Sequence, residues 1–122
     1  MKKLIAVLVM LATLAPAALA AGAHYIKVEP ASVKPGQVVR IYGSVGGGCA
    51  AGDSATLIST AFKGATKEEF AGVPAVYAKV HKNFKFSIKV RLSKGIKPGK
   101  YEIGGRCGGG NFGSAKLRVK HK

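Results

Sequence analysis

The chain has 122 residues, with 20 Lys and Arg against 5 Asp and Glu, and a formal net charge of +15. This length accommodates one ordinary domain, which excludes an enzyme built from separate cofactor and substrate domains. The hydrophobic fraction of 48% is raised by the first 20 residues, but the remainder is still apolar enough for a packed core, which argues against wholesale disorder.

The first 20 residues are typical of a secretory signal peptide. A basic start, Lys2-Lys3, precedes the apolar run Leu4–Leu14, which ends before Pro16. The run is shorter than the roughly 20 residues that a membrane span needs. An amphipathic core helix is the alternative, but no polar residues mark a face. The small residues of Ala18-Leu19-Ala20 suit a signal peptidase, so we expect cleavage after Ala20.

The remainder, residues 21–122, is expected to be a single released domain. No cysteine follows the cleavage region for lipid attachment, and the basic ending Leu117–Lys122 carries no hydrophobic tail or wall-sorting motif. Loss of Lys2-Lys3 leaves 18 basic and 5 acidic residues, a charge of +13. We therefore expect a mature form without a transmembrane anchor, secreted or loosely associated with the cell wall.

Beyond residue 23 the apolar residues alternate with a period of two, which indicates strands with one buried face. In the segment 84–92 the aromatic and aliphatic residues share one side, and the Lys, Arg and Ser residues share the other. Similar segments are 24–29, 37–45, 54–62, 75–81, 100–107 and 115–121. Seven short strands separated by turns predict an all-β, two-sheet sandwich.

Two connections repeat the pattern of Pro followed by Gly, in Val33-Lys34-Pro35-Gly36 and Ile96-Lys97-Pro98-Gly99. This order suits the central positions of a type II turn, where Gly supplies the positive φ. Each turn precedes a strand that leads toward a cysteine. The longer polar stretch Lys63–Gly72 contains Thr66 and Glu69 at capping-box spacing, which predicts one helical turn within a crossover connection.

Cys49 and Cys107 are the only cysteines. In an exported chain a lone pair favours one disulfide. A metal site or a reactive thiol is the alternative, but no CxxC motif or nearby His supports either. If the chain stays extended as far as Cys49, both cysteines lie on core-facing tracks. The bridge would then join the two sheets.

Several of these segments resemble a known group. Val28-Glu29-Pro30 and the segment Val33–Gly43 look like the opening of many small secreted bacterial immunoglobulin-like domains. Pro98–Ile103 and Arg106–Gly110 are similar to the sixth strand and last loop of these domains. Together with the motif Ser59-Thr60-Ala61-Phe62, these segments most resemble small exported, mostly uncharacterised proteins of high-GC Gram-positive bacteria. The resemblance implies a seven-stranded immunoglobulin-like sandwich with a disulfide between Cys49 and Cys107, and no particular activity.

Two features depart from antibody domains. No Trp is present to pack on the bridge. Tyr101 precedes Cys107 by six residues rather than two, which argues against the tyrosine corner of those domains.

Two glycine-rich segments, 46–53 and 108–113, flank the cysteines and are expected to lie at the same end of the sandwich. They offer a candidate ligand surface formed by Asp53, Arg106, Asn111 and Phe112. The alternative is that glycine serves only tight turns near the bridge. Neither segment is a phosphate loop, because no Lys-Ser or Lys-Thr follows.

The many basic residues are the strongest indication of a binding surface in this sequence. The candidates for polyanion binding are Lys85, Lys89, Arg91, Lys116, Arg118 and Lys120. A charge of +13 should attract anionic wall polymers or other polyanions in a salt-dependent way, through counterion release. The alternative is a solvated surface that serves solubility. Specific nucleic-acid binding is not expected, because the aromatic residues of segment 84–92 share the inward side.

No catalytic, metal or cofactor site is expected. His24, His81 and His121 are far apart in the sequence, and neither a GxSxG motif nor a second catalytic cysteine is present. The sequence therefore predicts a secreted, non-enzymatic binding or structural module of the cell envelope, with a basic face for anionic polymers. A small-molecule or glycan carrier that uses the glycine-rich end is the alternative.

Overall fold

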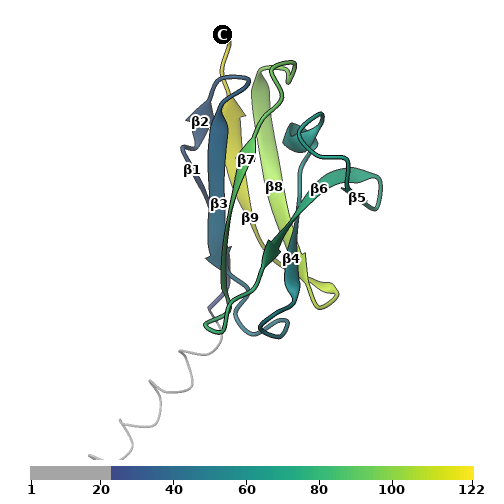
Figure 1. Ribbon diagram of the computed structural model, residues 1–122. Helices are drawn as coiled ribbons and strands as arrows, with labels where there is room; N and C mark the ends of the chain where they lie inside the picture. Colours follow the sequence, from purple (N-terminus) through teal and green to yellow (C-terminus); the bar gives the residue numbers. More distant parts are fainter. Residues whose placement is uncertain (1–22) are drawn as a thin grey trace, which may run out of the picture.

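A computed structural model describes residues 23–122, so the expected signal peptide at residues 1–20 lies outside the described residues. The described chain is all-β, with two stacked sheets and the core between them (Figure 1). Its elements are β1 (Tyr25–Glu29), β2 (Ser32–Val33), β3 (Val38–Ser44), β4 (Ser54–Ile58), the 3₁₀-helix η2 (Thr60–Phe62), β5 (Glu69–Phe70), β6 (Val73–Lys79), β7 (Lys85–Arg91), β8 (Gly99–Cys107) and β9 (Gly110–Val119).

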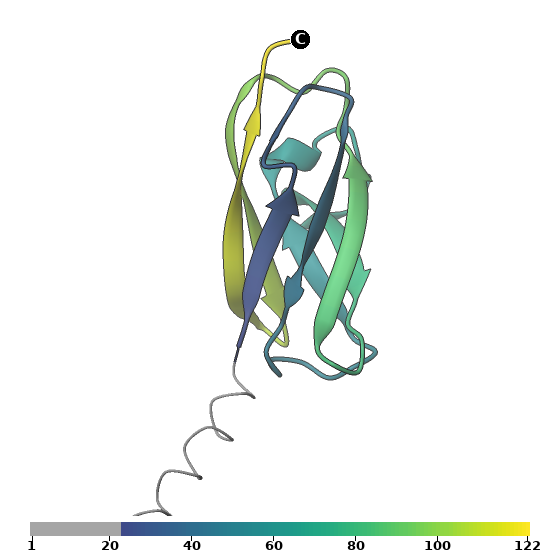
Figure 2. The ribbon, with the colours of Figure 1, turned by 90° about the vertical axis from the view of Figure 1, so that its left-hand side faces the viewer.

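The two sheets differ in size. One has three strands in the order β1-β3-β7, and the other has six in the order β2-β9-β8-β4-β6-β5. All neighbours are antiparallel except β2 and β9, which pair in parallel. Figure 2 shows β1, β3 and β7 side by side, with β9 in yellow next to β1. Because β1 also packs on β9, the two sheets meet along that edge.

The prediction of seven strands is too low. A strand overlaps each of the seven predicted segments, although β9 begins five residues before its predicted start at residue 115, and β2 and β5 are additional. Each is only two residues long. Alternation cannot reveal so short a strand, because it needs several residues to become visible.

The predicted strand 54–62 ends early, at Ile58, and η2 follows. The Ser59 hydroxyl caps η2 by accepting a hydrogen bond from the Ala61 amide at 3.1 Å. Adjacent side chains of a strand point to opposite faces, yet Ala61 and Phe62 are both fully buried. The helical turn is what allows both side chains to reach the core.

The predicted helical turn at Thr66 is wrong. The Thr66 hydroxyl accepts a hydrogen bond from the Glu68 amide at 3.1 Å and donates one to the Ala75 carbonyl at 3.0 Å. The chain then forms β5, which pairs with β6. The stretch is therefore not a crossover, because it connects β4 and β6, two neighbours within one sheet.

One of the two predicted type II turns agrees with the structure. Gly36 has a φ of +85°, and the Gln37 amide donates to the Lys34 carbonyl at 3.2 Å. Gly99 has a φ of +152°, far from the value near +80° that a type II turn requires. The second prediction is therefore wrong.

The core contains inward-facing side chains from both sheets. In β7 the predicted alternation is confirmed, since Phe86 and Val90 are buried while Lys85, Lys89 and Arg91 are exposed. Phe84 does not follow the pattern. It precedes β7, in a turn with a φ of +65°, and its side chain is exposed. The largest fully buried side chains are Phe62, Ile41, Leu57, Leu92, Ile103 and Leu117.

The disulfide between Cys49 and Cys107 is present. Its position differs from the expected link between core-facing strands. The chain turns at Gly46 and Gly47, both with positive φ, so Cys49 lies in the loop after β3. Cys107 is the last residue of β8. The bridge therefore ties a loop to a strand end and closes one end of the sandwich.

Substitution of Gly43 by alanine should reduce stability by about 1–3 kcal/mol, as expected for overpacking. An added Cβ would collide with the Tyr25 carbonyl oxygen, which is backbone and cannot rotate away. The collision would push β1 away from β3. Gly110→Ala is the control, because a Cβ there meets nothing within 4 Å. Urea unfolding should show a change within about 0.5 kcal/mol for the control, and similar losses in both variants would contradict the prediction.

Candidate functional site

The six predicted polyanion-binding residues lie on two surfaces, not on a single basic face. Lys85, Lys89 and Arg91 project outward from β7, in the three-stranded sheet. Lys116, Arg118 and Lys120 project outward from β9 and the residue after it, in the six-stranded sheet. The outer faces of two stacked sheets point in opposite directions.

The β9 surface is defined here by Lys97, Lys100, Lys116, Arg118, Lys120 and His121. Two adjoining hollows of about 530 and 760 Å³ lie on it. Lys100 and Arg118 line both hollows and are direct cross-strand partners. Like charges placed opposite each other destabilise a sheet. A bound anion between these two side chains would relieve that repulsion.

One acid belongs to the same region. Glu102 is the cross-strand partner of Lys116 and lines the smaller hollow. Opposite charges in this arrangement stabilise the sheet. The remaining cations of the β9 surface therefore outnumber the acid and give the hollows a positive potential.

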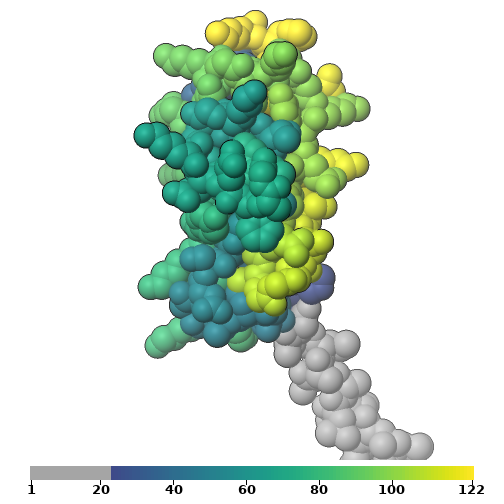
Figure 3. Space-filling view, turned by 90° about the vertical axis from the view of Figure 1, so that its right-hand side faces the viewer, coloured from purple at the N-terminus to yellow at the C-terminus, as the bar shows by residue number. Residues whose placement is uncertain are grey.

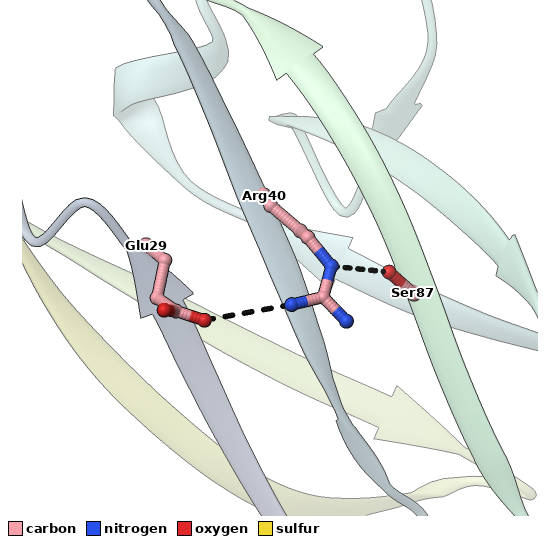
Figure 4. Close-up of polar contacts among 3 residues, drawn as sticks. All are labelled: Glu29, Arg40 and Ser87. Atoms are coloured by element: carbon pink, nitrogen blue, oxygen red, sulfur yellow. Dashed lines mark hydrogen bonds and ion pairs between the residues drawn. The ribbon is translucent and has the colours of Figure 1, made fainter.

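The β7 surface is defined here as the outer face of β1, β3 and β7. It carries the cations Lys27, Arg40, Lys85, Lys89 and Arg91 and the single acid Glu29. Arg40 forms an ion pair with Glu29, with 3.4 Å between Nη1 and Oε1, and donates from Nε to Ser87 Oγ at 3.0 Å (Figure 4). The guanidinium of Arg40 therefore links all three strands.

Two tyrosines lie among these cations. Tyr25 and Tyr42 are half-buried on the same outer face. The guanidinium carbon of Arg40 lies 4.2 Å from the centre of the Tyr42 ring, and Lys27 Nζ lies 5.7 Å from that of Tyr25. In the register of β1 and β3, Tyr25 faces Ser44, two residues from Tyr42, so the rings are diagonal neighbours.

Glu29 also acts on Tyr42. The Glu29 carboxylate raises the pKa of the Tyr42 phenol, chiefly through a side-chain hydrogen bond and also through its negative charge, and burial of the phenol adds to the shift. A tyrosine with its ordinary pKa of about 10 is already uncharged at neutral pH, so the ring adds no negative charge to the β7 surface.

Sequence reasoning missed this combination because it considered aromatic residues only in segment 84–92. The sequence did contain an indication in the neighbouring strands. Tyr25 and Lys27 are two residues apart, as are Arg40 and Tyr42, so each pair lies on one face of its strand. The pairing of the three strands was needed to bring these residues next to Lys85 and Ser87.

The segment 46–53 and the turn at Gly108-Gly109 lie at one end of the sandwich, as predicted, next to the disulfide. The rest of the second glycine-rich segment, residues 110–113, is not a loop but the beginning of β9. Three of the predicted ligand residues there form hydrogen bonds with nearby groups of the same end of the sandwich. Asp53 Oδ2 accepts a hydrogen bond from the Ala50 amide at 3.0 Å. Arg106 donates to the Asn111 side-chain oxygen at 3.3 Å and to the Gly109 carbonyl at 3.4 Å.

Arg106 also contacts β5. Its guanidinium carbon lies 5.4 Å from the ring centre of Phe70. In Figure 3 the segment from η2 to β6, in teal, lies directly beside the turn between β8 and β9, in yellow-green. Arg106 therefore joins this turn to the far edge of the sheet.

Phe112 is a core residue, which corrects its prediction as part of an exposed ligand loop. It belongs to β9, is 5% exposed, and meets Phe86 edge to face with ring centres 5.5 Å apart. The ring packs over Gly105. The aromatic side chain that was expected to line a carrier cleft is therefore buried in the domain itself.

Within residues 23–122, no three His, Cys, Asp or Glu side chains lie close enough together to hold a metal ion. His24 is engaged in a hydrogen bond between its Nδ1 and the Phe112 carbonyl, at 2.7 Å. The described part of the chain also contains no helix with the length and apolar character that a membrane crossing requires.

Comparison with known proteins identifies the fold and no family. No protein family matches the sequence, and no curated protein is significantly similar to it. Among solved structures, the chain is similar to Pseudomonas fluorescens alkylpurine DNA glycosylase AlkC bound to DNA containing an abasic site analog, with a TM-score of 0.52 and 11% identity. The match covers 81% of this chain but 29% of the glycosylase. At this identity the likeness concerns the fold alone.

Proposed function

We propose that the mature chain is a secreted, non-enzymatic immunoglobulin-like domain that binds anionic polymers at or near the cell envelope. The strand order supports the immunoglobulin-like assignment, since β1-β3-β7 corresponds to A-B-E and β9-β8-β4-β6 to G-F-C-C′. The Tyr101 hydroxyl donates to the Lys97 carbonyl at 2.6 Å, a contact of the kind that a tyrosine corner makes, despite the unusual distance to Cys107.

Export is supported by the disulfide together with the sequence of residues 1–20. A lone structural disulfide persists in oxidising compartments and is rare where thiols are kept reduced. The proposed location also supplies the ligand class, because the surface of a Gram-positive cell carries phosphate-rich wall polymers.

The observation that carries the binding proposal is the juxtaposition of Lys100 and Arg118 within the hollows of the β9 surface. A phosphate-rich chain in these hollows would contact these two cations and the exposed Lys97, Lys116 and Lys120. Each neutralised phosphate releases counterions, so affinity must fall steeply as salt rises.

Two triple variants with equal charge changes test the site. Lys116→Gln, Arg118→Gln and Lys120→Gln together should weaken binding of linear polyphosphate by about 10–100-fold at 0.1 M salt and lower the salt slope by about 2–3. Lys85→Gln, Lys89→Gln and Arg91→Gln remove the same charge from β7 and should have a much smaller effect. Isothermal titration calorimetry at several salt concentrations measures both quantities.

Each alternative has its own signature in this experiment. Equal losses in the two triple variants would show that polyphosphate does not prefer the β9 surface over the cations of β7, and would reject the β9 surface as the site. Wild-type affinity that does not change between low and moderate salt would reject electrostatic polymer binding altogether.

A further inference from the structure

We propose that the β7 surface is a second binding site, for single-stranded nucleic acid held without sequence preference. This goes beyond the polymer binding proposed above, because it requires planar rings in the ligand. Proteins that hold single strands in this way combine cations along the backbone path with aromatic rings on which bases stack, and Arg adds cation–π contacts. All three features occur on the outer face of β1, β3 and β7.

The charge of the surface suits a phosphate backbone. Its five cations face a single acid, Glu29, which is already paired with Arg40. Lys85, Lys89 and Arg91 are exposed on the outward side of β7, where alternate residues repeat at about 6.6 Å. They form a row along the sheet edge that can follow an extended strand of phosphates.

The rings lie beside that row. Arg40 is stacked on Tyr42 and held by Glu29 and Ser87, so its guanidinium plane is fixed before any ligand arrives. Unpaired bases stack both on aromatic side chains and on Arg guanidinium planes. Tyr25, diagonal to Tyr42, offers a second ring.

The surface is also hollowed where these groups meet. A depression of about 350 Å³ is lined by Tyr25, Arg40, Tyr42, Lys85 and Ser87, together with His81 and Asn83 from the turn before β7. The depression gives a planar base room between the tyrosines and the cation row. An acidic polysaccharide would satisfy the cations but would leave the fixed Arg–Tyr stack without a planar partner.

The test compares ligands that differ only in their bases. We expect a short oligothymidylate to bind at least about 10-fold more tightly than an abasic deoxyribose-phosphate chain of the same length. Isothermal titration calorimetry measures the affinities, because two of the four Tyr residues are replaced in the variants and their fluorescence cannot serve as the signal. Tyr25→Ala with Tyr42→Ala should abolish the difference between the two ligands, because each lost ring should weaken binding of the oligothymidylate by about 5–160-fold. Tyr25→Phe with Tyr42→Phe should preserve the difference.

Tyr77→Ala provides the matched control, because Tyr77 is 41% exposed on the outer face of the other sheet. It should leave the base-dependent difference unchanged, and so should the β9 triple variant. Equal binding of the oligothymidylate and the abasic chain would overturn the proposal. So would an acidic polysaccharide that binds as tightly and depends on the same two tyrosines. Either result leaves polyphosphate binding by the β9 surface untouched, because that is measured with a ligand without rings.

Discussion

Replacement of Cys49 and Cys107 together by alanine should lower the free energy of unfolding by about 4 kcal/mol. The two cysteines are 58 residues apart in sequence, and the chain-entropy account of a loop this long gives a stabilisation of that size. The bridge closes the end of the sandwich where glycine-rich loops leave few side chains to pack. A loss of this size is a large fraction of the stability of a small domain.

Urea unfolding of the oxidised wild type, the reduced wild type and the double variant measures the effect and separates its causes. The two latter proteins lack the cross-link, but only the variant lacks the sulfur atoms that pack beside the core. Equal losses indicate that chain connectivity is responsible. A loss below about 1 kcal/mol in both would contradict the prediction. Polyphosphate binding by the folded fraction should persist, because Lys100 and Arg118 lie at the opposite end of β8 and β9.

The sheet architecture was predictable from the sequence because most strands have one wet face. In β7 the alternation of Lys85, Phe86, Val90 and Arg91 directly records which side is buried. The edge strands β2 and β5 were not predictable, since two residues carry no period. Their formation depends on a partner, as in the parallel pairing of Ser32 and Val33 with β9.

The disulfide illustrates the same limit. The cysteine count and the expectation of export were enough to pair the only two cysteines, Cys49 and Cys107. They did not reveal that Gly46 and Gly47 turn the chain away from an extended path. A local change of backbone direction therefore moved the bridge from the sandwich interior to its end without changing the pairing.

The candidate sites depend on contacts between distant segments, which one sequence does not specify. Six candidate cations were identified from the sequence and Arg40 was not among them, but whether a cation faces another cation or an acid depends on strand register. Lys100 faces Arg118, whereas Arg40 lies between Glu29 and Lys89. The first arrangement leaves repulsion that an anion can relieve, and the second immobilises a guanidinium beside a ring. The same kind of residue thus takes different roles on the two faces.

The segment after β4 shows where alternation fails. A strand continued through residue 62 would place Ala61 inward with Leu57 and would direct Phe62 to the outer face. The structure buries both residues in η2, under the cap that Ser59 provides. The apolar pattern was read correctly as buried, but its geometry was assigned to the wrong element.

Phe62→Ala should therefore reduce stability by about 3–5 kcal/mol, the usual loss for a phenylalanine removed from a packed core. Phe62 is fully buried, and η2 packs on both β6 and β8. Phe70→Ala is the matched control from the same connection, because Phe70 is 36% exposed. The Phe70 ring contacts the guanidinium of Arg106, and loss of this contact should cost about 1 kcal/mol or less.

Urea unfolding of the two variants decides between a turn and a strand at this position. An outward-facing Phe62 would behave like Phe70, and the two losses would be similar. A loss several times larger for Phe62→Ala requires the side chain to fill the core, which adjacent Ala61 and Phe62 can do together only if the backbone turns at Ser59. The experiment therefore tests an element of this sandwich whose geometry the alternating pattern misassigned.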